Sequence, residues 1–207
     1  MAVDGRVARG EKTRRAVLDA GVALASLDGL AGLTLARLAQ SLGVSKSGLF
    51  AHWPDKESLQ LAIVAHARRQ WEELIVSPAL REPKGLRRLW AVHANRMAFY
   101  ENAVLPGGCF FKATEHEFED SPGPVRDAIA AALDDWKDMI VRLAGEAVVI
   151  GELRPEADPR QLAFEIQAIG SAVVTHAHLL RDPDSYRYAR RAVLDRLRAL
   201  ATDPTIL

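Results

Sequence analysis

The sequence predicts an all-α protein of about nine helices, and two observations lead to that fold class. Apolar residues recur three and four positions apart along almost the whole chain, which is typical of amphipathic helices. No stretch alternates apolar and polar residues between turn signals, as a half-buried strand would. The 207 residues suffice for one large domain or two small ones, and the pattern indicates short helices first and a larger bundle after them.

The first quarter of the chain predicts three helices separated by short turns. Glycine after an apolar stripe is typical of a helix end, and a hydroxyl side chain before one is typical of an N-cap. The expected boundaries are Gly29 at the end of the first helix, Thr34 and Gly43 at the two ends of the second, and Ser45 and Trp53 at those of the third.

The remaining residues predict a long fourth helix and then the bundle. The fourth helix begins after Asp55 and should break at Ser77-Pro78, because proline disrupts a helix interior. Asp158 before Pro159, with Gln161 three residues on from Asp158, indicates another helix start. The clearest helical stripes in this part cover residues 86–100, 125–147, 159–181 and 185–201.

Residues 35–54 have the spacing of a helix-turn-helix. Two short helices that meet at a steep angle need a small residue at their crossing, which Ala39 supplies. Gly43 suits a left-handed turn, and Leu49 is spaced to pack the second helix onto the first. The opposite face would then be free to enter a DNA major groove, and it carries Ser45, Lys46, Ser47, Gly48 and His52.

The segment LTLARLAQSLGVSKSGLFAHWPDKESL resembles the DNA-binding domain of tetracycline-repressor-like (TetR) transcriptional regulators. The resemblance covers about residues 12–62; the rest of the chain is similar only in being helical and of suitable length. Phe50 replaces the family's tyrosine and lacks its hydroxyl, and Trp53 replaces the usual phenylalanine. The pattern is met at Thr34, Leu38, Ala39, Gly43, Val44, Ser45, Leu49, His52, Lys56 and Leu59.

The resemblance implies a role for several of these positions. Lys46, Ser47 and His52 would face base edges or nearby phosphates. Thr34 and Lys56 would hold phosphates, which carry no sequence information. A basic arm that includes Arg14 could reach the backbone or a minor groove, or could be a free tail; on a solvated helix these side chains could equally be ordinary surface residues. The implied DNA-contact residues are Thr34, Ser45, Lys46, Ser47, Gly48, Phe50, His52, Lys56 and Arg14.

Charge and composition agree with this division. The 27 basic and 27 acidic residues cancel, but residues 1–56 carry eight basic and five acidic side chains, which suits a polyanionic partner. The single cysteine, Cys109, excludes an intrachain disulfide and favours a reducing compartment. The N-terminus lacks the apolar run of a secretory signal, and no apolar run approaches a membrane span, so we expect a cytoplasmic protein with no membrane partner.

Enzymatic chemistry has no motif in this sequence. Gly-rich phosphate loops, zinc-protease and nucleophile-elbow motifs are absent, so we interpret the chain as a non-enzyme without a cofactor. His116 and Asp120 are one helical turn apart and could suggest a metal, but a solvated acidic helix end is the commoner explanation, and we predict no metal site. Cys109 is interpreted as an inert core thiol rather than a redox sensor.

The bundle is expected to hold a small, mostly apolar effector and to form the dimer. Sites of this kind lie between helices of bundles, although any one aromatic residue is more often plain core. The last two helices, about 159–181 and 185–201, are the expected dimer surface, because Ala168, Gly170, Ser171 and Ala172 allow close approach. The candidate ligand-binding residues are Trp71, Trp90, His93, Met97, Tyr100, Cys109, Phe110 and Trp136.

Together these features predict a homodimeric, ligand-responsive regulator that represses transcription from a pseudo-palindromic operator. Residues 1–55 would bind DNA and residues 56–207 would bind ligand and dimerise. The long fourth helix would be the one contact through which the sensor reaches the DNA-binding helices. The alternative is a helical hydrophobe-binding protein without specific DNA binding, and an activator or nucleoid-type binder is a further possibility.

Overall fold

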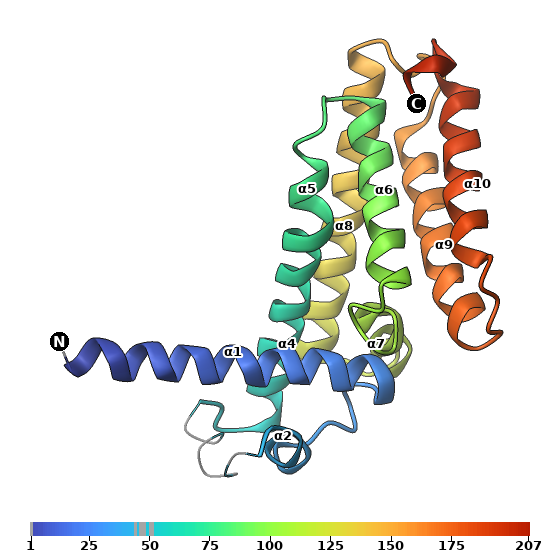
Figure 1. The fold of residues 1–207 in the computed structure, drawn as a ribbon. Coiled ribbons are helices and arrows are strands. Elements are labelled where there is room, and N and C mark those ends of the chain that lie inside the picture. The colour runs from blue at the N-terminus through green and yellow to red at the C-terminus, as the bar shows by residue number, and fades with distance from the viewer. Residues whose placement is uncertain (1, 44, 46–48, 50–51) are drawn as a thin grey trace. The chain divides into compact units, whose positions relative to one another are not determined.

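The computed structural model describes the whole chain except residues 1, 44, 46–48 and 50–51 (Figure 1). Every described element is helical, and the one β-bridge, between Leu153 and Ala201, is isolated. The all-α prediction is therefore confirmed. The described residues form two compact units: residues 1–69 with 105–130, and residues 70–104 with 131–207.

The first unit contains the first and second predicted helices, with boundaries close to those expected, whereas most of the third, predicted over 45–53, lies outside the described residues. Its elements are α1 (Ala2–Asp28), α2 (Leu35–Leu42), most of α4 (Lys56–Trp71), α7 (Phe110–Phe118) and the start of α8 (Pro124–Val149). Thr34 caps α2 through its hydroxyl, which accepts a hydrogen bond from the N–H of Arg37 at 3.2 Å. Gly43 ends α2 in the left-handed conformation at φ 63°, as its position predicted.

Helix α1 is longer than the apolar stripe indicated, because the basic segment before Val17 is helical back to Ala2. Its C-terminal end is held by the 105–109 segment. Gly107 donates its backbone N–H to Ser26 Oγ at 3.1 Å, and a Cβ at this position would overlap the Ser26 carbonyl. Only glycine permits this approach of two backbones.

The expected break at Ser77-Pro78 is wrong. A π-helical segment, Glu72–Val76, follows α4 directly, and the short helix α5 (Ser77–Ala79) then includes the proline. The wider turn explains this, because the Ser77 N–H reaches back to Glu72 and the missing N–H of Pro78 falls at the start of the next turn. Asn95 also donates its side-chain amide to the Ile75 carbonyl at 3.0 Å.

The second unit is the bundle. It contains α6 (Leu86–Glu101), the greater part of α8, α9 (Pro159–His178), α10 (Ser185–Leu200) and a short 3₁₀ turn, Pro204–Ile206. Helix α10 packs on α6 and α9, and α6 also contacts α9. Asp158 caps α9 as predicted, whereas the Gln161 side chain bonds Glu165 instead of turning back to the cap.

Candidate DNA-binding and effector sites

The two residues that the spacing assigns to the helix-turn-helix core are buried. Ala39 and Leu49 are 6% and 1% exposed, so the small residue and the leucine both lie in the core of the first unit. Trp53 is buried as well, and the guanidinium carbon of Arg14 lies 5.9 Å from its ring centroid. This cation–π contact ties α1 to the end of the motif and gives Arg14 a structural role in addition to its implied one.

The predicted DNA-contact residues that the structure describes are all exposed to solvent. They are Thr34, Ser45, His52, Lys56 and Arg14. The others, Lys46, Ser47, Gly48 and Phe50, lie outside the described residues. Exposure is what a DNA-contact role requires, and the roles themselves stay predictions.

The segment between α1 and α2 is held by polar side chains from two other helices. Lys56 and Gln60 of α4 donate hydrogen bonds to the carbonyls of Ala31 and Leu30. Glu117 of α7 accepts hydrogen bonds from the N–H groups of the same two residues. The expectation that α4 alone reaches the DNA-binding helices is therefore wrong, because α7 contacts α1 and bonds the entry to α2.

Gly29 is suited to this junction in two respects. Its φ of 80° lies in the left-handed region, and a Cβ there would fall 1.9 Å from Glu117 Oε1. The predicted helix stop is thus also the position where the α7 carboxylate approaches the backbone.

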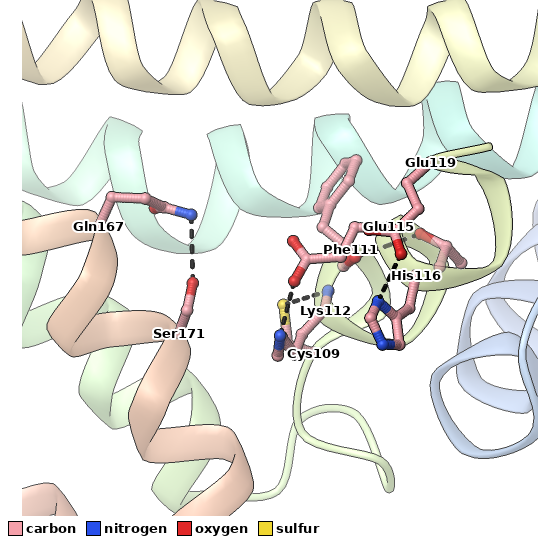
Figure 2. A network of polar contacts seen from close by, with 9 residues as sticks. Cys109, Phe111, Lys112, Glu115, His116, Glu119, Gln167 and Ser171 are labelled. Atoms are coloured by element: carbon pink, nitrogen blue, oxygen red, sulfur yellow. Dashed lines mark hydrogen bonds and ion pairs between the residues drawn. The ribbon is translucent and has the colours of Figure 1, made fainter. Parts of the chain in front are cut away.

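The candidate ligand residues fall into both units. Cys109 and Phe110 are buried in the first unit, where the Cys109 sulfur accepts a weak hydrogen bond from the Lys112 N–H at 3.4 Å and caps α7 (Figure 2). Trp90, in the second unit, is only half-buried, beside a surface groove of α10. The remaining candidates are buried in the second unit: Trp71, His93, Met97, Tyr100 and Trp136.

Three of these buried residues surround a side chain that sequence reasoning missed, Arg96. It is 1% exposed, and its guanidinium carbon lies 5.7 Å, 5.6 Å and 5.3 Å from the ring centroids of Trp71, Tyr100 and Trp136. Each cation–π contact contributes about 0.5–2 kcal/mol. Three of them are comparable with the several kcal/mol that desolvating one ion costs. The cage can therefore hold the cation inside the bundle.

Two hydrogen bonds fix the Arg96 guanidinium. Its Nε–H donates to the Tyr100 hydroxyl at 2.8 Å, and an NH1 hydrogen donates to Gln167 Oε1 at 2.9 Å. Gly170 makes room for it, because a Cβ there would lie 2.4 Å from NH1. The sequence contained a pattern that indicates a buried arginine, because Arg96 lies on the same helical face as Leu89, His93 and Tyr100.

His93, one turn before Arg96, is a neutral imidazole. Burial lowers its pKa to about 4, and the charge of Arg96 acts in the same direction. Its Nε2 lies 3.1 Å from the Ala189 carbonyl, which can only accept, so Nε2 carries the proton. Nδ1 is then a buried acceptor, and no described residue donates a hydrogen bond to it.

Comparison with known proteins identifies the family. The model for bacterial regulatory proteins of the tetR family matches residues 17–63. The model for the tetracyclin repressor-like C-terminal domain matches residues 85–193, which is more than half of the chain. The chain belongs to the TetR family. No curated protein matches it in sequence.

Solved structures support the same fold. A TetR transcriptional regulator from Chloroflexus aurantiacus is 26% identical over 93% of this chain and 98% of its own, with a TM-score of 0.84. A Saccharomonospora viridis protein in complex with choline is 17% identical over 92% and 98%, with a TM-score of 0.78. AibR, in complex with isovaleryl coenzyme A and operator DNA, is 23% identical over 86% and 95%, with a TM-score of 0.67.

In this TetR-family chain, α9 and α10 expose an apolar surface. Phe164 and Tyr188 are 68% and 53% exposed, and a groove beside Tyr188 is lined by Ile169, Ala172, Val173, His176, Ser185, Ala189 and Ala192. Ala168 and Ala172 are exposed as a close-approach surface requires. Gly170 and Ser171 are not: Gly170 is buried against Arg96, and Ser171 bonds Gln167 at 3.3 Å (Figure 2).

The acidic segment around α7 forms ion pairs. Lys112 binds Glu115 at 2.7 Å and His116 binds Glu119 at 3.1 Å, both on the helix surface (Figure 2). Across the described part of the TetR-family chain, no group of three or more potential metal ligands gathers. None of its described helices has the length and apolar character needed to cross a bilayer.

Proposed function

We propose that this protein is a homodimeric transcriptional repressor that binds a pseudo-palindromic operator and is released by a small molecule. The observation that carries the proposal is the burial of Ala39 and Leu49, the two residues that the helix-turn-helix spacing assigns to its core, together with the exposure of Thr34, Ser45 and His52. One such motif in each protomer requires half-sites about one helical turn, or a multiple, apart. In this proposal residues 1–55 bind DNA, and residues 56–207 bind the effector and dimerise.

The dimer in this proposal forms through α9 and α10. Phe164, Ala168 and Ala172 follow one another at four-residue intervals and are all exposed, so they make one stripe along α9. Tyr188 and Ala192 do the same on α10. An apolar stripe of this kind favours a partner, and a two-fold axis would pair α9 and α10 with their copies as a four-helix interface.

The effector site in this proposal is the aromatic cluster of the second unit. Relatives of the same fold hold choline or isovaleryl coenzyme A. Trp71, Tyr100 and Trp136 offer apolar ring surface between helices, which is where bundles place small molecules. Release from DNA would follow because α4 and α8 each run from the second unit into the first.

A gel shift with DNA from the region upstream of the protein's own gene tests the proposal. We expect a specific complex of two protomers per site, competed by the same DNA and not by an unrelated sequence. A complex with equal affinity for all sequences would favour a nucleoid-type binder. Failure to bind any DNA at low salt would favour the helical hydrophobe-binding protein.

A further inference from the structure

Arg96 is a buried charge with no acidic side chain paired to it among the described residues. At 1% exposure it has almost no contact with solvent, and an arginine side chain cannot lose its proton in a protein. Its hydrogen-bond partners among the described residues, Tyr100 and Gln167, are both neutral. The aromatic cage offsets desolvation but leaves the positive charge uncancelled, so the site attracts an anion.

The site also has donors available for such an anion. A guanidinium has five N–H donors, and described residues accept from two of those of Arg96, which leaves three toward this part of the chain. The indole N–H of Trp136, whose ring lies 5.3 Å from the guanidinium carbon, is buried and finds no hydrogen-bond acceptor in the part of the chain that the structure describes. A planar carboxylate matches the fork of a guanidinium and can accept from it at both oxygens.

The charge of the site selects a monoanion. His93 is neutral in the folded protein, so it adds no second positive charge beside Arg96. One carboxylate cancels the charge of Arg96, whereas a phosphate monoester carries about −1.5 to −2 at neutral pH and would leave buried negative charge. A cationic ligand would meet a like charge at the centre of the rings.

We propose that the effector is a monocarboxylate with an apolar body, its carboxylate bound by Arg96 and its body against Trp71, Tyr100 and Trp136. This inference rests on the proposed function, because it names the chemical class that the sensor bundle recognises. A cationic effector and a neutral one are both disfavoured by the same buried charge.

Binding at Arg96 would also reach α9. A carboxylate that takes both NH1 and NH2 competes with Gln167 Oε1, which now accepts from NH1 at 2.9 Å. Gln167 lies on α9 and bonds Ser171, one turn further along that helix. Effector binding would therefore change hydrogen bonds on a helix that we assign to the dimer surface.

The test compares carboxylates with their amides on the purified full-length protein without DNA. The probes are decanoate, 4-phenylbutyrate and phenylacetate, each beside its primary amide, and decyl phosphate. Binding is followed by tryptophan fluorescence and thermal shift. We expect at least one carboxylate to bind at least tenfold more tightly than its amide and than decyl phosphate. Equal binding of acid and amide, tighter binding of the phosphate, or no binding of any carboxylate at millimolar concentration would overturn the inference.

Two variants assign the effect to Arg96. Arg96→Met keeps the length and apolar stem and should abolish the preference for the acid over the amide. Gly170→Ala keeps a regular helix but places a methyl group against NH1, so it should weaken carboxylate binding tenfold or more with the charge still present. Arg191→Met, on the exposed surface of α10, is the control and should bind as the wild type does.

The outcomes separate this inference from the proposed function. An acid preference retained in Arg96→Met, or carboxylate binding left at wild-type strength in Gly170→Ala, would overturn the assignment to Arg96. If Arg96→Met does not fold, Gly170→Ala decides alone. DNA binding is measured by gel shift without any probe present. If the protein binds operator DNA but no carboxylate, only the proposed ligand class is refuted. If it binds carboxylates but no DNA, only the proposed role as a transcriptional regulator is refuted.

Discussion

Glu117 Oε2 accepts a hydrogen bond from the backbone N–H of Leu30 at 2.6 Å and a second from Ala31 at 3.2 Å. Glu117 belongs to α7, far along the chain from the helix-turn-helix. Lys56 and Gln60 bind the carbonyls of the same two residues. The backbone of Leu30 and Ala31 thus takes side-chain hydrogen bonds from α4 and α7, so the entry to α2 depends on α7 as well as on α4.

Replacing Glu117 with alanine should loosen this junction. Two backbone N–H groups would lose their acceptor, and each unsatisfied group costs about 1–3 kcal/mol when buried. Because the hydrogen bond of Leu30 is part-buried and that of Ala31 is exposed, we expect the low end of that range, which is about tenfold faster amide exchange at Leu30 and Ala31. Amide hydrogen exchange, monitored by NMR, measures the change in exchange rate.

Glu119→Ala is the matched control for charge. Glu119 pairs with the exposed His116 at 3.1 Å and makes no contact with the α1–α2 segment that the structure records. Exchange at Leu30 should be unchanged in this variant. If both variants accelerate exchange equally, net charge rather than the Glu117 contact is responsible.

Local signals predicted the first unit well, because its turns depend on residues that are close in sequence. Thr34 and Gly43 were identifiable as the two ends of α2 since a hydroxyl cap and a left-handed glycine act within a few residues. The continuation of the helix through Pro78 was not predictable in the same way. It depends on the π-helical turn before it and on Asn95, which bonds Ile75 from α6.

The proposed effector site was less predictable, because its residues are far apart in the sequence. Aromatic content indicated Trp71, Tyr100 and Trp136 but gave no reason to connect them. Arg96 connects them, and a charged residue in an apolar stripe is the pattern that could have drawn attention to it. Gly170 was assigned to the dimer surface because small residues allow close approach. Its close neighbour is Arg96, and composition alone cannot distinguish the two faces of α9.

Acidification should destabilise the bundle through His93. Its pKa is lowered from 6.5 to about 4 in the folded protein, so the unfolded chain binds the proton more readily between these values. Stability from this histidine is therefore full above about pH 6.5 and falls as pH decreases, by about 2 kcal/mol between pH 7 and pH 5. Urea unfolding at both pH values, at a fixed protomer concentration, measures the loss.

His93→Gln should remove this pH dependence. The amide can still donate toward the Ala189 carbonyl but has no proton to gain in this range. The difference in unfolding free energy between wild type and variant should shrink by about 2 kcal/mol from pH 7 to pH 5. His116→Gln, at an exposed position, is the control. A constant difference for His93→Gln would mean that this histidine is not the group that titrates.

Lys56→Ala should weaken binding to operator and unrelated DNA by similar factors. A phosphate contact carries no base information, and losing one should lower the slope of log K against log salt by about one unit. Lys56 also holds the Ala31 carbonyl, so Gln60→Ala, which loosens the same segment without removing charge, is the control. An equal change of slope in both variants would count against phosphate binding by Lys56.

Lys46→Ala should behave differently, because a lysine in the groove can reach guanine acceptors. We expect a changed sequence preference in a selection from randomised half-sites, and the preference of Lys56→Ala should match the wild type. If Lys56→Ala changes the preference and Lys46→Ala does not, the implied roles of the two lysines are reversed.

Phe164→Glu should dissociate the dimer. The side chain is 68% exposed on α9, and a carboxylate placed twice across a two-fold axis would be desolvated beside its copy. We expect monomers at micromolar concentration by sedimentation, and loss of tight operator binding. Val149→Glu, at an 86% exposed position outside α9 and α10, is the control. A dimeric Phe164→Glu would exclude this face.

Effector and operator should weaken each other by the same factor. Coupling free energies are typically about 1–3 kcal/mol, so saturating decanoate should lower operator affinity by roughly 5–150-fold, and saturating operator should lower decanoate affinity equally. The factor should approach one in Glu117→Ala, because α7 would no longer fix the entry to α2. Operator affinity without decanoate should change much less in that variant than the coupling does. Titrations of the wild type and Glu117→Ala in both orders measure all four affinities. Full coupling in Glu117→Ala would show that the signal reaches the DNA-binding helices without this contact.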